Sequence, residues 1–143
     1  MAKLISEEDE KAIIAAIKEA ELNTSGEVQV HFESHCKDDV LERAAAVFST
    51  LKMHKTKLRN GVLFYMAIKD HKFAILGDAG INKVTPDNFW EDIKEEMRGF
   101  FVKGEIAAGV CKGIKMAGEQ LKDHFPYQDD DINELPDEVS FGD

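Results

Sequence analysis

Residues 61–68 constrain the fold of this chain more strongly than any other part of its sequence. They read Gly-Val-Leu-Phe-Tyr-Met-Ala-Ile, without the polar alternation that marks a strand exposed on one face. A strand of this composition needs cover on both faces, so it predicts the central strand of a sheet. A chain of 143 residues is long enough to bury such a core as one ordinary domain.

The segments around this central strand predict a β-α-β unit followed by a hairpin. Residues 28–33 alternate apolar and polar side chains, which is typical of a strand covered on one face. A helix is expected to start near Asp39 and to lead into the central strand. After the short connection 69–71, residues 72–76 predict a third strand that runs antiparallel to the second.

Three further helices complete the predicted order αβαββαα. The first is capped by Ser6, and another is expected to start at Thr85-Pro86, where a hydroxyl cap precedes a proline. The order predicts the α/β fold class, with a small mixed sheet and about four helices. We assign residues 1–125 to this domain and residues 126–143 to an acidic tail. Such a tail is expected to be flexible, although its apolar residues would also allow it to pack back on the domain.

Strand polarity predicts which turns of the chain meet. The first two strands should be parallel with a right-handed crossover, and the third should return antiparallel. Residues 24–27, 59–61 and 77–80 then gather at one end of the sheet, and we call these three turns the rim. Each turn contains glycine, which lets a backbone approach a ligand closely or adopt a positive φ.

The rim brings together Glu27, Asn60 and Asp78, with Arg59 beside them. Two carboxylates and an amide oxygen are hard donors suited to Ca²⁺ or Mg²⁺, and an arginine next to a metal can hold a phosphate. A structural interpretation stays open, because the same carboxylates can cap turns or pair with Arg59. Asp70, in the hairpin connection, is a secondary metal candidate whose alternative role is turn formation.

Three motifs at the rim resemble the TPM domain family. They are residues 24–28 (TSGEV), 59–63 (RNGVL) and 77–81 (GDAGI), and the resemblance extends over about residues 5–125. It implies a compact three-layer α/β/α sandwich, with helices on both faces of a small sheet. It also implies acid phosphatase activity and divalent-cation binding, and its acidic motif positions correspond here to Glu27 and Asp78, with Asn60 beside them.

Charge and hydropathy exclude several other classes of function. The net charge is −10, from 18 basic and 28 acidic residues, so a nucleic-acid groove is not expected. No apolar run is long enough to span a bilayer, and the N-terminus turns acidic too early for a secretion signal, so we expect a cytoplasmic protein. Cys36 and Cys111 match no metal or CxxC spacing and are expected to be free thiols.

The leading hypothesis is a protein that binds a divalent cation, Ca²⁺ before Mg²⁺, through Glu27, Asn60 and Asp78. Hydrolysis of a phosphomonoester would then use Arg59 and Asp78 as catalytic residues, with a phosphorylated small molecule or protein as substrate. The alternative is a non-enzymatic, metal-stabilised module that binds a protein partner through the rim or the acidic tail. A redox role would rest on Cys36 alone.

Overall fold

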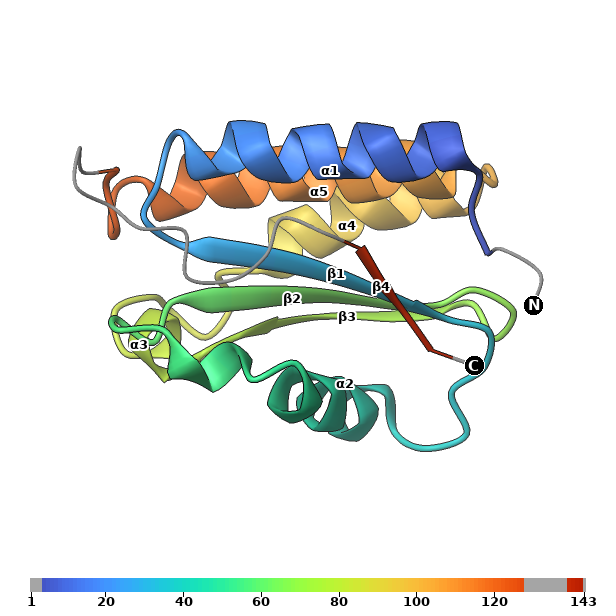
Figure 1. Ribbon diagram of the computed structural model, residues 1–143, viewed down its shortest axis with the longest axis horizontal. Helices are drawn as coiled ribbons and strands as arrows, with labels where there is room; N and C mark the ends of the chain where they lie inside the picture. Colours follow the sequence, from blue (N-terminus) through green and yellow to red (C-terminus); the bar gives the residue numbers. More distant parts are fainter. Residues whose placement is uncertain (1–3, 128–138, 143) are drawn as a thin grey trace.

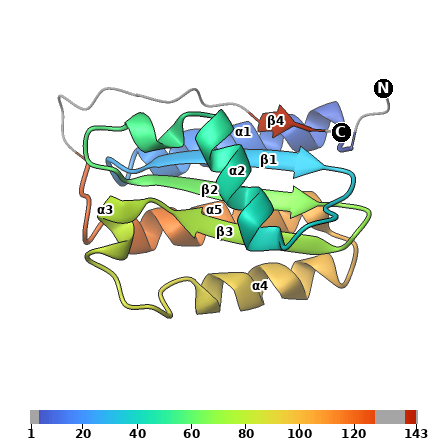
Figure 2. The same ribbon diagram turned by 90° about the horizontal axis from the view of Figure 1, so that it is seen from below.

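The computed structural model describes residues 4–127 and 139–142, which form three layers around a central sheet (Figure 1). The strand order is β3-β2-β1-β4. One face of the sheet is covered by three helices, α1 (Glu7–Glu21), α4 (Glu91–Phe101) and α5 (Ile106–Leu121). The other face is covered by α2 (Val40–Thr50), which crosses the strands (Figure 2). The expected α/β sandwich is therefore confirmed.

The sheet has the mixed polarity that the sequence predicts. Strands β1 (Glu27–Glu33) and β2 (Gly61–Ala67) are parallel, and β3 (Lys72–Gly77) pairs antiparallel with β2. All seven residues of β2 are buried, because the α1/α5 layer covers one face and α2 covers the other. The apolar run of the sequence is thus the central strand of the β-α-β unit and its hairpin.

Strand β1 differs from its predicted half-covered state, because all seven of its residues are buried. Val28, Val30 and Phe32 face the larger core under α1 and α5. The polar side chains at the alternate positions are buried as well, and the last of them, Glu33, bonds to Arg43 of α2. The alternation in the sequence therefore marks two different buried environments and no solvent-exposed face.

A fourth strand, β4 (Val139–Phe141), lies parallel to β1 at the edge of the sheet. Val139 is buried there, and the Phe141 ring stacks on that of Phe32 with 6.0 Å between centroids. The Ser140 hydroxyl lies 2.7 Å from Nδ1 of His31. This segment belongs to the predicted tail, and residues 128–138 of that tail lie outside the described part of the chain.

Two of the predicted helix starts are confirmed by their caps. The Ser6 hydroxyl accepts the N–H of Asp9 at 3.0 Å, and the Asp39 carboxylate accepts two N–H groups at the start of α2. The expected start at Thr85-Pro86 is wrong, because α4 begins at Glu91. The Thr85 hydroxyl instead donates to the carbonyl of Ile81 at 2.8 Å, so it closes the turn after a preceding short helix.

That short helix is α3 (Ala79–Asn82), and a single 3₁₀ turn, η1 (Met53–Lys55), lies before β2. Both lie at the end of the sheet where the rim is found, as Figure 1 shows for α3. Among residues 4–127 and 139–142, no helix has the length and apolar character that crossing a bilayer requires.

We predict that ending the chain at residue 138, which removes β4, lowers the free energy of unfolding by about 2 kcal/mol. The stability is lost because the buried packing of Val139 is removed and the outer edge of β1 loses its paired strand. Urea denaturation measures it, and Ser140→Ala in the full chain isolates the contribution of the hydroxyl near His31. An unchanged midpoint in the truncated chain would show that β4 adds no stability.

Candidate functional site

The three turns of the rim lie together at one edge of the sheet, as strand polarity requires. Glu27 is directly opposite Gly61 in the parallel ladder, and its N–H donates to the carbonyl of Asn60 at 3.3 Å. On the other side of β2, the N–H of Asp78 donates to the carbonyl of Gly61 at 3.0 Å. Glu27 of β1, Gly61 of β2 and Asp78, which directly follows β3, therefore form one row.

Arg59 and Asp78 form the strongest polar contact of the rim. Arg59 Nε lies 2.7 Å from Oδ2 of Asp78, and Nη2 lies 2.8 Å from Oδ1, so the pair is bidentate. Oδ1 also accepts the N–H of Ala79 at 2.7 Å, which caps α3. The Asp78 carboxylate is buried while the Arg59 side chain is about half exposed. Hydrogen bonding to Asp78 raises the pKa of Arg59.

Asn60, next to Arg59 in the sequence, has a buried side-chain amide. Its backbone N–H donates to the Thr56 hydroxyl at 3.2 Å, and Nδ2 lies 3.5 Å from the Ser25 hydroxyl. Its Oδ1 is fully buried and accepts no hydrogen bond from any residue that the structure describes. A buried acceptor left in this state costs about 1–3 kcal/mol, so the oxygen is a ready position for a bound donor or cation.

Glu27 is buried in the same row as Asp78, and Gly61 separates the two backbone positions. Met53 of η1 packs over that glycine, because a Cβ built on Gly61 would lie 3.2 Å from the Met53 carbonyl oxygen. Arg59 and Asn60 are thus consecutive in the sequence, and Arg59 contacts Asp78. Glu27 belongs to the same edge, on the far side of Gly61.

Gly80 holds α3 directly against the turn that contains Arg59. Its N–H donates to the Arg59 carbonyl at 2.8 Å. A Cβ at this position would overlap the Leu58 carbonyl oxygen and would lie 2.6 Å from that of Arg59. Because both neighbours are backbone atoms, they cannot rotate away as a side chain would. The rim geometry thus depends on glycine at position 80.

Asp70, the secondary metal candidate, lies at the opposite end of the sheet. Its Oδ1 is 2.8 Å from Nδ1 of His35, and Oδ2 accepts the N–H of Cys36 at 2.6 Å. The hydrogen bond with His35 has the larger effect and that of Cys36 the smaller, and both lower the pKa of Asp70. Asp70 therefore links the hairpin to the loop after β1. Cys36 and Cys111 are free thiols, as expected, and Cys36 Sγ donates to the Asp38 carbonyl.

A buried charged cluster on the α2 face was not predicted from the sequence. Its centre is Glu33, whose carboxylate accepts hydrogen bonds from Tyr65 Oη at 2.5 Å and from Arg43 Nε at 3.1 Å. His31 Nε2 lies 3.1 Å from the same carboxylate. The alternation along β1 places His31 and Glu33 on one face, but Arg43 and Tyr65 come from α2 and β2. No local sequence motif predicts that these four residues meet.

The cluster shifts the titration of its members. Burial alone would raise the pKa of Glu33, but hydrogen bonds from Arg43, Tyr65 and His31 outweigh it and lower this pKa to about 2. Burial lowers the pKa of His31 despite the neighbouring carboxylate, and burial followed by the Glu33 hydrogen bond raises the pKa of Tyr65. The cluster thus combines an ionised Glu33 with a neutral His31 near pH 7.

We predict that Gly80→Ala lowers the free energy of unfolding by about 3 kcal/mol, because the added methyl group meets backbone carbonyls. Gly99→Ala is the matched control, since a Cβ on Gly99 in α4 meets no atom of the described residues within 4 Å. Alanine at that helical position should stabilise by up to about 1 kcal/mol. Equal effects of the two substitutions in urea denaturation would contradict the close contact at Gly80.

We predict that stability falls with acidification in two ranges. The folded pKa of His31 is below its unfolded value, so stability falls as pH drops below 6.5. The folded pKa of Glu33 is also depressed, so its contribution is present above 4.5 and is lost as pH falls toward about 2. Denaturation curves across pH measure both.

The substitution Glu33→Gln should remove the lower of these two ranges and destabilise the protein at pH 7. The same change at the exposed Glu42, which lies on α2 outside the cluster, is the control and should leave the pH profile unchanged. If the Glu33→Gln variant still loses stability below pH 4.5, that loss comes from other carboxyl groups.

Comparison with known proteins identifies the family. The model of the TPM domain matches residues 1–120. The NMR structure of the BA42 protein from the psychrophilic bacterium Bizionia argentinensis is 46% identical in sequence, with a TM-score of 0.94. That alignment covers 99% of this chain and 98% of BA42. No curated protein matches the chain.

Two more distant structures show the same fold alone. The N-terminal domain of cg2496 from Corynebacterium glutamicum has 13% identity and a TM-score of 0.66, covering 95% of this chain and 80% of that one. The N-terminal domain of a protein from P. gingivalis has 18% identity and a TM-score of 0.68, covering 87% and 82%. With the family match spanning most of the sequence, this chain belongs to the TPM domain family.

Proposed function

We propose that this TPM domain binds a divalent cation at the rim, Ca²⁺ before Mg²⁺, and holds a phosphomonoester there for hydrolysis. The observation that carries the proposal is the buried Oδ1 of Asn60, which accepts no hydrogen bond within residues 4–127 and 139–142. It is adjacent in sequence to Arg59, which holds Asp78. Amide and carboxylate oxygens are the donors that hard cations prefer.

The residues of the rim fit a cation of this kind. In Asp78, Oδ1 already receives hydrogen bonds from Arg59 and Ala79, while Oδ2 receives one from Arg59. A carboxylate oxygen has two lone pairs, so Oδ2 retains one for a further partner. Glu27 supplies a second carboxylate at the same edge. The described residues hold no group of three or more His, Cys, Asp or Glu suited to a metal. A cation at the rim would therefore be bound by amide and carboxylate oxygens together.

Arg59 has the position needed to bind a phosphoryl group. Its side chain is about half exposed, and its guanidinium presents five N–H donors, of which the Asp78 contact uses two. It can therefore donate hydrogen bonds to Asp78 and to phosphate oxygens at the same time. A bound cation would stabilise negative charge on those oxygens. Asp78 would hold the cation through Oδ2 and keep Arg59 oriented through its two hydrogen bonds.

We predict that Ca²⁺ raises the melting temperature and that Asp78→Asn abolishes this increase. At a free concentration of 100 times Kd, the stabilisation amounts to about 2.7 kcal/mol. Asp70→Asn is the matched control, since it makes the same chemical change at the opposite end of the sheet and should retain the increase. Stabilisation that survives Asp78→Asn but not Asp70→Asn would move the cation site to the hairpin.

Arg59→Gln separates the two parts of the proposal. Because Arg59 competes with a cation for Asp78, its loss should tighten Ca²⁺ binding while it removes hydrolysis of p-nitrophenyl phosphate between pH 5 and 9. Ca²⁺ stabilisation without turnover in the native protein would instead indicate the non-enzymatic, metal-stabilised module. The bidentate Arg59–Asp78 pair, which engages both oxygens of the carboxylate, is the observation that favours this second function.

A further inference from the structure

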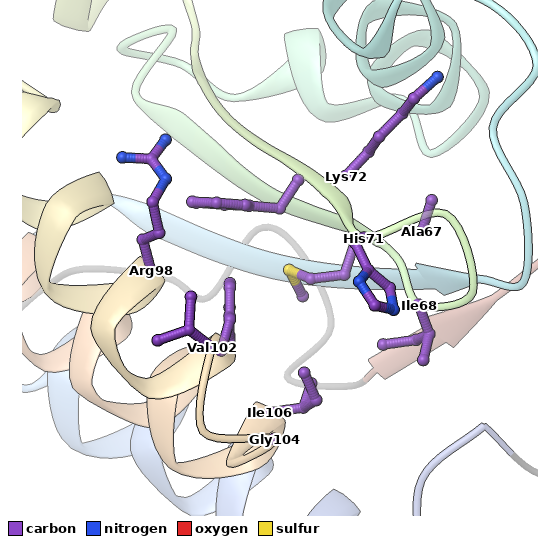
Figure 3. A pocket seen from close by; sticks show the side chains of 11 residues that line it. Ala67, Ile68, His71, Lys72, Arg98, Val102, Gly104 and Ile106 are labelled. Atoms are coloured by element: carbon purple, nitrogen blue, oxygen red, sulfur yellow. The ribbon is translucent and has the colours of Figure 1, made fainter.

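A hollow lies at the end of the sheet opposite the rim. It is a cavity of about 600 Å³ between the β2–β3 hairpin and the turn that joins α4 to α5. In Figure 3, Ile68 and His71 lie on its hairpin side, and Val102 and Ile106 lie on its helical side. Its volume is within the range of small-molecule sites in proteins, roughly 300–1,000 Å³.

Helix α4 borders the cavity through Arg98 and Phe101. Helix α4 packs on α5 and lies alongside the β3 edge (Figure 2). It meets β3 through Phe101, whose ring packs edge to face on Phe73 at 4.9 Å between centroids. The side chains of Met66, Ile68 and Ile106 consequently line a hollow that is mainly apolar. An alkyl chain would gain contacts there that water does not supply.

The charged side chains that line the cavity are all basic, although the protein has a net charge of −10. Lys72 points away from it in Figure 3, because its Nζ donates to the Cys36 carbonyl at 3.0 Å. Arg98 lies over the Phe73 ring, with the guanidinium carbon 5.7 Å from the centroid. Its one ion-pair partner among the described residues is Glu95, and both side chains are more than half exposed.

We propose that this cavity binds an amphipathic monocarboxylate, with its alkyl chain in the apolar hollow and its carboxylate on Arg98. The guanidinium fork matches a carboxylate in a bidentate geometry, and a single guanidinium matches a single negative charge. Because exposed ion pairs contribute little, Glu95 can be displaced by a ligand that also buries an alkyl chain. This site is independent of the cation and phosphate chemistry proposed for the rim.

Titration with decanoate, below the concentration at which it forms micelles, tests the proposal by methyl NMR. Saturable shifts are expected for the methyl groups of Met66, Ile68 and Ile106, with no change at Ile81 near the rim. Decan-1-ol should bind at least fivefold more weakly, because it lacks the charge. Octanoate should bind about tenfold more weakly than decanoate, because two methylene groups are lost.

Variants of α4 separate anion recognition from apolar binding. Arg98→Gln should weaken decanoate binding about tenfold without changing decanol binding, and Glu95→Gln should tighten decanoate binding about twofold. Lys94→Gln is the control, because Lys94 forms the same kind of ion pair, with Glu91, without lining the cavity. Ile106→Trp should fill the hollow and weaken both ligands, with the fold checked by the unchanged spectrum of the rim.

Three results would overturn the proposal. Equal affinities for decanoate and decanol, unchanged by Arg98→Gln, would show a hollow without anion recognition. Shifts that do not saturate, or that spread over the surface, would show detergent-like association. Binding to phosphatidylglycerol vesicles that exceeds binding to free decanoate would assign the Arg98 surface to a lipid bilayer.

Discussion

The burial of β2 on both faces is the constraint on which the rest of the structure depends. A strand with apolar residues on both sides needs a helical layer above and below the sheet. One layer is supplied by α2, which also has to connect β1 to β2 in a right-handed crossover. That connection makes the two strands parallel, so their starting turns lie at one edge. The antiparallel return of β3 adds the turn that contains Asp78, and the rim is the result.

The two ends of this sheet have different chemistry. At the rim, Arg59 forms a bidentate ion pair with Asp78, and its sequence neighbour Asn60 has a buried amide oxygen that accepts no hydrogen bond from the described residues. At the hairpin end, Asp70 is engaged by His35 and a backbone N–H, and an apolar hollow opens beside Arg98. The proposed cation site and the proposed monocarboxylate site are thus separated by the length of the strands. A ligand at one end has no direct contact with a ligand at the other.

Between these ends, the α2 face contains a charged cluster that costs desolvation energy. Glu33 remains ionised in this buried position because Arg43, Tyr65 and His31 all turn hydrogen-bonding groups toward it. The last of these also contacts Ser140 of β4, so the cluster connects the edge strand to α2 through side chains. A fully satisfied network of this kind favours one arrangement of its elements over others, because any other arrangement would leave buried groups unpaired.

The sequence by itself determined the features that depend on neighbouring residues. The lack of polar alternation identified residues 61–68 as the central strand, Ser6 and Asp39 were recognised as caps, and strand polarity placed the three rim turns at one edge. Only the tertiary structure decided which polar residues share a buried environment. Arg43 and Tyr65 meet Glu33 across three elements, Thr85 closes a turn where a helix start was expected, and Val139 returns to pair beside Val30. Local patterns encode periodicity and capping, whereas these contacts join residues far apart in the chain, and their free energy exists only once the layers have packed.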